Sequence, residues 1–350
     1  MFLKNANLFG NTVNIEIENG KIKYVGTEKT EDGIDLNDSE VIPGLIDTHI
    51  HGCNGFDTLS CNFEPMCDFL AKNGTVAWYP TLVTTDYDTM KKVTDEIPDV
   101  KGAKILGYHL EGPYLSKQYK GAHNEKLIKA PDLKELDSLK NVGIITVAPE
   151  IDGAFEIIKK KDISVSLGHT ACDYETALKA IDCGAEAITH TFNAMPPLHH
   201  RNPGLIGAAF NRQCYAEIIS DGFHVHPINV LLIYKMFGDK MILVSDALEC
   251  TGMPDGEYYL NGMKFIMKDF TARYENGTIV GGTHTLFQCV KLAESFGIPW
   301  ENAVKAASEI PAKRFGLKKG KIEEGYDADL IILDKERKIK SVILNGEFYE

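Results

Sequence analysis

Eight short apolar segments recur along the chain, with helical stretches between them. They span residues 44–47, 76–81, 105–109, 144–147, 163–167, 187–190, 216–220 and 241–245. Alternation of strands and helices predicts a parallel sheet, and strands that are apolar throughout are typical of a sheet buried on both faces. Eight such units favour an α/β fold of the (β/α)8 TIM-barrel type over an open doubly wound sheet. A glycine-rich phosphate loop, which an open dinucleotide-binding sheet would carry, does not follow the first segment.

The two ends of the chain have a different pattern. Residues 11–26 form two alternating stretches about the pair Asn19 and Gly20, which is a strong signal for a β-hairpin. Short strands with turns return at residues 325–334 and 339–346. Because chain termini often lie close together, we expect the strands of both ends to pair in one small β-sandwich domain.

These patterns predict how the chain is divided. The small β domain would contain residues 1–43 and 317–350, and the barrel would contain residues 44–316. Residues 252–283 combine turn residues with alternating apolar positions, which indicates a β insertion over the mouth of the barrel. Helices are expected from residue 173 to a stop at Gly184 and over residues 300–315.

Composition excludes several classes of function. The chain has 350 residues, of which 44% are hydrophobic and 25% charged, as in ordinary globular proteins. Its net charge of −13 and its lack of basic runs argue against a nucleic-acid partner. Neither a signal peptide nor a long apolar segment is present, so we expect no membrane association. The eight cysteines form no CxxC pair, which favours a reducing compartment, and we expect a cytoplasmic location.

Titratable side chains stand at five of the predicted strand ends. His49 and His51 leave the first strand at a spacing that places both on one face of an extended segment. The other four ends carry Glu111, His169, His190 and Asp246. Because the C-terminal ends of barrel strands converge on one site, we expect these side chains to meet in a pocket. Imidazole and carboxylate groups are suitable ligands for a divalent ion such as Zn²⁺ or Fe²⁺.

Other histidines have simpler interpretations. His109 lies two residues before Glu111 on the same predicted strand, and we expect it to belong to the core rather than to the ligand set. Loop positions without a ligand role are expected for His199, His200 and His226. Asp246 has two interpretations at this point, because a carboxylate there would serve either as a helix cap or as a general base.

Motifs spread over nearly the whole chain resemble those of one enzyme family. The segment PGLIDTHIHG at residues 43–52 is similar to the signature of the amidohydrolase superfamily. Within that superfamily, the chain resembles the N-acetylglucosamine-6-phosphate deacetylases in the ordered motifs HLEGP, KGAHN, SLGHT, THTFNAM, SDGFH and VSDA. The resemblance implies a homodimeric, metal-dependent hydrolase that releases acetate from a small amino-sugar phosphate.

The resemblance also implies roles for individual residues. Glu111, His169 and His190 would bind the essential ion, Asp246 would accept and return a proton, and His123 would polarise the acetyl carbonyl. The implied substrate contacts are Ala122, His123, Asn193, Ala194, Arg201, Asp221, His224, His284, Thr285 and Leu286. Of these contacts, Arg201 and His224 would bind the phosphate.

Two positions separate this chain from other members of the family. His284 and Leu286 stand where Leu and Met are often found. Some members lack the first-strand histidine pair and bind one ion, whereas His49 and His51 would allow a second ion, bridged to the first by Glu111.

Two other functions are compatible with parts of this pattern. One alternative is another amidohydrolase, such as a dihydropyrimidinase, a dipeptidase or a deaminase. Many of these enzymes bridge two metals with a carboxylated lysine, whereas the candidate bridge here is Glu111. The other alternative is a noncatalytic sugar-phosphate sensor, against which the intact set of Asp246 and the histidines argues.

Overall fold

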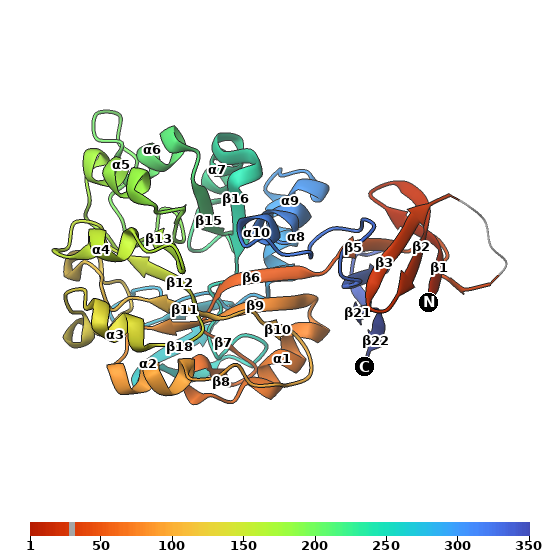
Figure 1. The fold of residues 1–350 in the computed structure, drawn as a ribbon, viewed down its shortest axis with the longest axis horizontal. Helices are drawn as coiled ribbons and strands as arrows, with labels where there is room; N and C mark the ends of the chain where they lie inside the picture. Colours follow the sequence, from red (N-terminus) through yellow and green to blue (C-terminus); the bar gives the residue numbers. More distant parts are fainter. Residues whose placement is uncertain (28–31) are drawn as a thin grey trace.

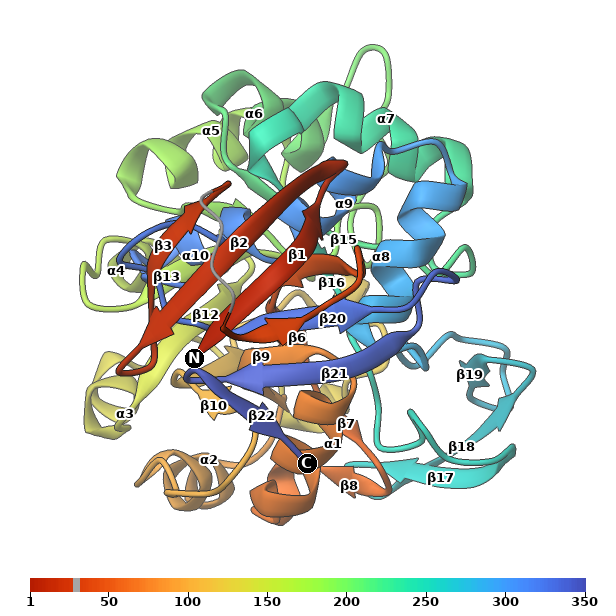
Figure 2. The same cartoon turned by 90° about the vertical axis from the view of Figure 1, so that its right-hand side faces the viewer.

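A barrel and a small β-sheet domain beside it make up the molecule (Figure 1). The computed structural model describes residues 1–27 and 32–350. The sheet domain lies at one end of the barrel and contains both chain termini (Figure 2). Among the described residues, no helix has both the length and the apolar character needed to span a bilayer.

The barrel sheet is parallel, and each of the eight predicted apolar segments overlaps one of its strands. These strands are β6 (Leu45–Ile50), β9 (Thr75–Val83), β11 (Tyr108–Glu111), β12 (Val142–Val147), β13 (Ser164–Leu167), β14 (Ala187–Ile188), β15 (Tyr215–Ile219) and β16 (Met241–Val244). A short strand, β10 (Lys104–Ile105), also pairs with β9. Between β16 and β6, the Asp246 N–H donates to the His49 carbonyl over 2.9 Å. The (β/α)8 prediction is therefore confirmed.

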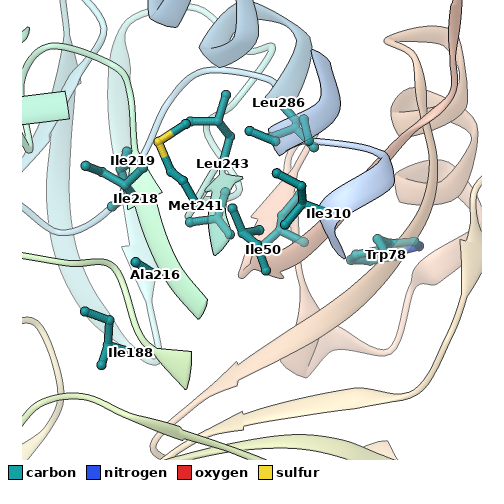
Figure 3. Close-up of a cluster of buried hydrophobic side chains, with 14 of the residues drawn as sticks. Ile50, Trp78, Ile188, Ala216, Ile218, Ile219, Met241, Leu243, Leu286 and Ile310 are labelled. Carbon is teal, nitrogen blue, oxygen red and sulfur yellow. The ribbon is translucent and has the colours of Figure 1, made fainter. Parts of the chain in front are cut away.

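Helices surround the barrel and bury its outer face. They are α1 (Phe63–Lys72), α2 (Tyr87–Thr94), α3 (Leu133–Ser138), α4 (Ala154–Ile158), α5 (Tyr174–Cys183), α6 (Gly204–Arg212), α7 (Pro227–Phe237), α8 (Leu286–Ser295), α9 (Trp300–Ala306) and α10 (Glu309–Arg314). Leu243 of β16, Leu286 of α8 and Ile310 of α10 belong to one buried cluster (Figure 3). Burial of such side chains stabilises the interface between sheet and helices by about 1.5–3 kcal/mol each.

Both predicted helices exist, but the second is divided. Helix α5 begins after Asp173, whose carboxylate accepts from the Thr176 N–H, and it ends at Gly184. The expected helix at 300–315 is instead α9 and α10, which are separated by two residues. Ser308 lies at the break with φ −138° and ψ −76°, outside the helical region. Helical periodicity continues across such a break, so the sequence pattern does not reveal it.

Strands from both chain ends form the small domain. They are β1 (Phe2–Leu8), β2 (Asn11–Glu18), β3 (Lys21–Gly26), β4 (Ile34–Asp35), β5 (Glu40–Pro43), β20 (Leu330–Leu333), β21 (Ile339–Leu344) and β22 (Glu347–Tyr349). The hairpin predicted at Asn19 and Gly20 joins β2 and β3. The strands form one sheet. At its edge, the Ile22 N–H of β3 donates to the Tyr326 carbonyl over 2.9 Å, so β3 also contacts the C-terminal part of the chain. The small domain therefore consists of one sheet, instead of the two packed sheets of a sandwich, and residues from both chain ends share its hydrophobic core.

A three-stranded antiparallel sheet occupies the predicted insertion. It consists of β17 (Gly256–Leu260), β18 (Met263–Lys268) and β19 (Thr271–Arg273). A small hairpin of β7 (Gly52–Cys53) and β8 (Phe56–Asp57) follows the first barrel strand. Single 3-10 turns complete the elements at Thr58–Ser60, Lys117–Tyr119, Glu125–Leu127 and Gly238–Lys240. The division of the chain at 43/44 and 316/317 into separate folding units stays a prediction.

One carboxylate links the small domain to the barrel. Glu40 of β5 accepts a hydrogen bond from the Trp300 Nε1–H over 2.6 Å and another from the Arg337 Nε–H over 2.8 Å. Arg337 also stacks over the Trp300 ring at 4.3 Å and pairs with Glu294 of α8. This contact therefore joins the N-terminal and C-terminal parts of the sheet domain to helices α8 and α9.

Replacing Glu40 by Ala should weaken the molecule measurably. The change leaves the Trp300 and Arg337 donors without their acceptor, and we expect the free energy of unfolding to fall by about 1–3 kcal/mol. Thermal and urea unfolding will measure it. Glu18→Ala in β2 is the matched control, because the Glu18 side chain forms a solvent-exposed pair with Lys23 and its loss should cost less than about 0.5 kcal/mol. Equal effects of the two substitutions would contradict the linking role of Glu40.

Candidate active site

The carboxylate of Glu111, at the end of β11, is the centre of the site. It is buried, and five histidine rings surround it. The shortest nitrogen–oxygen distances to Glu111 are 2.9 Å from His190, 3.1 Å from His169, 3.1 Å from His123, 3.2 Å from His51 and 3.4 Å from His49. Burial alone would raise the pKa of Glu111, but the imidazoles around it hold the pKa well below its usual range. Glu111 is therefore an ionised carboxylate.

Glu111, His169 and His190 form the first candidate ligand group. Glu111 Oε1 lies 3.1 Å from His169 Nε2 and 2.9 Å from His190 Nε2, and the two nitrogens are 3.0 Å apart. Ligand atoms around a tetrahedral Zn²⁺ stand roughly 3.3 Å apart, because each bond is about 2.0 Å long. The His169 Nδ1–H donates to the Tyr119 carbonyl over 2.9 Å, which leaves Nε2 as the unprotonated ligand atom. This geometry fits a divalent ion.

His49, His51 and Asp246 form the second candidate ligand group. The Nε2 atoms of the two histidines are 3.3 Å apart, and each lies 3.3 Å from Asp246 Oδ1. The His51 Nδ1–H donates to the Thr81 carbonyl over 3.1 Å, so its Nε2 also faces the site as a free ligand atom. Glu111 contacts both groups, with Oε1 near the first and Oε2 near His51. It is therefore placed to bridge two ions.

His123 presents a hydrogen-bond donor to the same space. The Thr84 N–H donates to His123 Nδ1 over 3.2 Å, which places the proton of the neutral ring on Nε2. Nε2 lies 3.1 Å from Glu111 Oε2. Burial lowers the pKa of His123 to about 4, so the ring is neutral at neutral pH. A neutral donor at this place suits the polarisation of a carbonyl.

Left-handed backbone turns aim several of these side chains. His169, His190 and Asp246 follow their strands with φ values of 47°, 28° and 49°, in a region that non-glycine residues rarely adopt. Such strain is found where the surrounding structure fixes a functional residue. Burial alone would raise the pKa of Asp246, but His51 and His49 lower it to about 2, so this carboxylate is available as a proton acceptor.

A cavity of about 200 Å³ opens over these groups. The predicted residues that line it are His51, Glu111, Ala122, His123, His169, His190, Asn193, Ala194, His224 and Asp246. The insertion at residues 252–283 supplies Leu260, Thr278, Ile279 and Val280, which were not among the predicted site residues. These four carry no titratable group, so their residue types do not mark them as part of a site.

Other predicted contacts are placed differently. Asp221 accepts from His224 Nδ1 over 2.6 Å, so it orients His224 rather than lining the cavity. Arg201 is exposed, with its guanidinium 2.7 Å from His200 Nε2, and it does not line the cavity of its own chain. His109 is buried among core hydrogen bonds, with Nε2 2.8 Å from Thr146 Oγ1, as expected of a core histidine.

The segment at 284–286 lies outside the lining of the cavity. Thr285 caps α8 through a reciprocal pair of hydrogen bonds with Gln288. Leu286 is fully buried in the barrel core. The His284 ring stacks against Phe270 at 5.1 Å and Phe223 at 6.4 Å. A direct substrate contact by any of these three residues therefore stays a prediction.

Comparison with known proteins agrees with this geometry. The model of the amidohydrolase family matches residues 41–348. The N-acetylglucosamine-6-phosphate deacetylase of Vibrio furnissii is 33% identical, over 94% of this chain and 88% of that one. The N-acetylgalactosamine-6-phosphate deacetylase of Escherichia coli O157:H7 is 32% identical, over 89% of this chain and 88% of that one.

Solved structures agree as well. The N-acetylglucosamine-6-phosphate deacetylase of Thermotoga maritima superposes with a TM-score of 0.91 at 33% identity, covering 99% of each chain. A variant of the Mycobacterium smegmatis deacetylase in complex with N-acetyl-D-glucosamine-6-phosphate gives 0.93 at 30% identity, covering 99% of this chain and 98% of that one.

A (β/α)8 barrel whose strand ends gather histidines and carboxylates into metal-ligand groups is the architecture of a metal-dependent hydrolase. The chain belongs to the amidohydrolase family, in the group of the N-acetylglucosamine-6-phosphate deacetylases.

Replacing Glu111 by Gln should remove both activity and bound metal. The amide keeps the size of the side chain but loses the negative charge that both ligand groups share. Elemental analysis and an acetate-release assay will measure the two losses. Glu18→Gln, at an exposed position in β2, is the control and should change neither. A Glu111→Gln protein with full metal occupancy and wild-type rate would overturn the ligand assignment.

Proposed function

We propose that the protein hydrolyses the acetamide of N-acetyl-D-glucosamine 6-phosphate to D-glucosamine 6-phosphate and acetate. The observation that carries this proposal is one cavity in which a metal-ligand group, a neutral imidazole N–H and an ionised carboxylate face the same space. The substrates named for the similar enzymes support an amino-sugar phosphate. Two divalent ions, such as Zn²⁺ or Fe²⁺, would match the two ligand groups.

The chemistry divides among a few residues. Glu111, His169 and His190 would hold the essential ion, and His49 and His51 would hold the other. A bound divalent ion supplies a water that ionises near neutral pH and a positive charge near the reacting carbonyl.

Protein groups carry the remaining steps. His123 donates its Nε2–H to the oxyanion that develops as the amide carbonyl is attacked. Asp246 accepts the proton of the attacking water and returns it to the leaving nitrogen, since an amine leaves readily only when it is protonated. The buried position of both groups strengthens these interactions, because little water competes with them.

His224 and Arg201 are the proposed phosphate partners. His224 lines the cavity, and its Nδ1 is occupied by Asp221, so Nε2 is the atom left for a ligand. Arg201 belongs to the segment after β14 that also carries Asn193 and Ala194. A planar guanidinium binds phosphate through two parallel hydrogen bonds. Because Arg201 does not line its own cavity, movement of this segment or another copy of the chain would have to complete the contact.

A homodimer in the cytoplasm is the setting that we propose. The eight free cysteines suit a reducing compartment. Exposed apolar side chains gather on α6 and α7, namely Phe210, Ile228 and Leu232, and they are a suitable surface for a second copy to cover. Sedimentation analysis measures the assembly directly.

N-acetylgalactosamine 6-phosphate is the second candidate substrate. The deacetylases named for the two sugars match this chain at 33% and 32% identity, so identity does not separate them. The two sugars differ only in the configuration of one ring hydroxyl. Parallel kcat/KM measurements on both phosphates will decide between them, and a preference for the galactose form would overturn the proposed substrate while keeping the reaction.

Replacing Asp246 by Asn should lower kcat by at least about 100-fold, because the amide cannot accept and return the proton. Substrate should still bind, as equilibrium binding of the phosphorylated sugar will show. Asp182→Asn is the matched control, because Asp182 makes only an exposed pair with Arg212. A near-wild-type kcat in the Asp246 variant would refute the proton role.

Replacing Arg201 by Ala should lower kcat/KM for the phosphorylated sugar by roughly 10- to 150-fold, which corresponds to the loss of one charge-assisted hydrogen bond of about 1.5–3 kcal/mol. Turnover of unphosphorylated N-acetylglucosamine should stay almost unchanged. Arg212→Ala, in the exposed pair with Asp182, is the control for removing a surface charge. Equal losses on the two sugars would contradict phosphate binding by Arg201.

A further inference from the structure

Two oppositely charged side chains are fully buried in the barrel, below the candidate metal centre. Glu217 comes from the middle of β15, and Arg314 is the last residue of α10. Arg314 NH1 lies 3.0 Å from Glu217 Oε1, and neither side chain is exposed. Removing two charges from water is costly, and pairs of this kind often stabilise a fold no better than apolar residues do. Stability alone therefore gives no reason for this pair.

The free oxygen of Glu217 faces a candidate metal ligand. Glu217 Oε1 accepts from both Arg314 and the Thr48 hydroxyl, the latter over 3.3 Å. Glu217 Oε2 lies 3.5 Å from His49 Nδ1. Within the described residues, both of these buried atoms lack a hydrogen-bond partner. Each is therefore the natural partner of the other.

A hydrogen bond between these two atoms would fix the orientation of His49. A metal-binding histidine usually donates its second ring N–H to a carboxylate or a carbonyl, which fixes the tautomer and the direction of the ring. His51 and His169 use the carbonyls of Thr81 and Tyr119 for this purpose. For His49 the facing acceptor is Glu217. Donation from Nδ1 leaves Nε2 unprotonated, at 3.3 Å from both His51 Nε2 and Asp246 Oδ1.

Arg314 holds Glu217 in the required position. Its NH2 donates to the hydroxyls of Ser164 and Ser166 on β13, over 3.0 Å and 2.8 Å. These two serines lie on the same face of their strand, so the guanidinium spans β13 and β15 inside the barrel. Its positive charge also compensates the carboxylate at a place that water does not reach.

We propose that Glu217 and Arg314 form a positioning pair that controls the binding of a second divalent cation at His49 and His51. Glu217 fixes His49, and Arg314 fixes Glu217. The inference rests on the proposed function, because it concerns the second ion of that same centre. It adds two residues that touch neither the ion nor the substrate.

Metal titration of the whole chain tests this proposal. Metal-free wild type, Glu217→Gln and the double variant E217M/R314M are titrated with Co²⁺, and the absorption of the bound ion gives two dissociation constants. We expect Glu217→Gln to weaken the second ion by about 10- to 100-fold and to leave the first within about three-fold of wild type. The double variant should unfold close to the wild-type temperature and still bind the second ion weakly. If Glu217→Gln does not fold, the double variant provides the measurement.

A control and three outcomes complete the experiment. Asp329→Asn removes a buried carboxylate paired with Lys319 in the small domain, so it should leave both constants unchanged. The proposal is overturned by wild-type affinity for the second ion in the variants, by equal weakening of both ions, or by a wild type that binds only one. Acetate release by the wild-type protein tests the proposed function separately.

Discussion

The structure depends on one buried carboxylate among five imidazoles. Glu111 contacts both candidate ligand groups, and its ionised form is tolerated away from water only because those rings, or the cations they bind, compensate it. The rings come from β6, from the segments that follow β11, β13 and β14, and from the chain between β6 and β7. A closed barrel brings these distant segments within 3.4 Å of one group. The hydrophobic layer between sheet and helices therefore serves the chemistry by fixing where the strands end.

Much of this architecture was predictable from the sequence, because the barrel topology brings residues at the ends of separate strands to one place. The eight apolar segments identify strands buried on both faces, and their C-terminal ends must converge once the barrel is assumed. This reasoning brought Glu111, His169, His190 and Asp246 together without any knowledge of side-chain positions. The hairpin at Asn19 and Gly20 was predictable for a different reason, since that pair suits the tight turn that joins two strands.

What escaped prediction has a common physical origin. The break between α9 and α10 is a backbone event at Ser308 that leaves helical periodicity intact. Glu217 stands inside an apolar strand and Arg314 at the end of a short helix, and no local pattern indicates that they meet in the interior. Thr278 and Val280 line the cavity through shape alone. In each case the information lies in a contact between segments far apart in sequence.

Thr84, which follows strand β9, connects three parts of the site that otherwise look independent. Its N–H orients His123, its hydroxyl donates to the Glu111 carbonyl over 3.0 Å, and its own carbonyl accepts from Asn261 Nδ2 over 3.0 Å. Asn261 lies at the turn between β17 and β18, in the sheet that contributes Leu260 to the cavity wall. A displacement of that turn would act on the same residue whose N–H determines which nitrogen of His123 carries the proton. Hydrogen bonds of a single residue thus connect the insertion that covers the cavity to two groups of the reaction centre, His123 and Glu111.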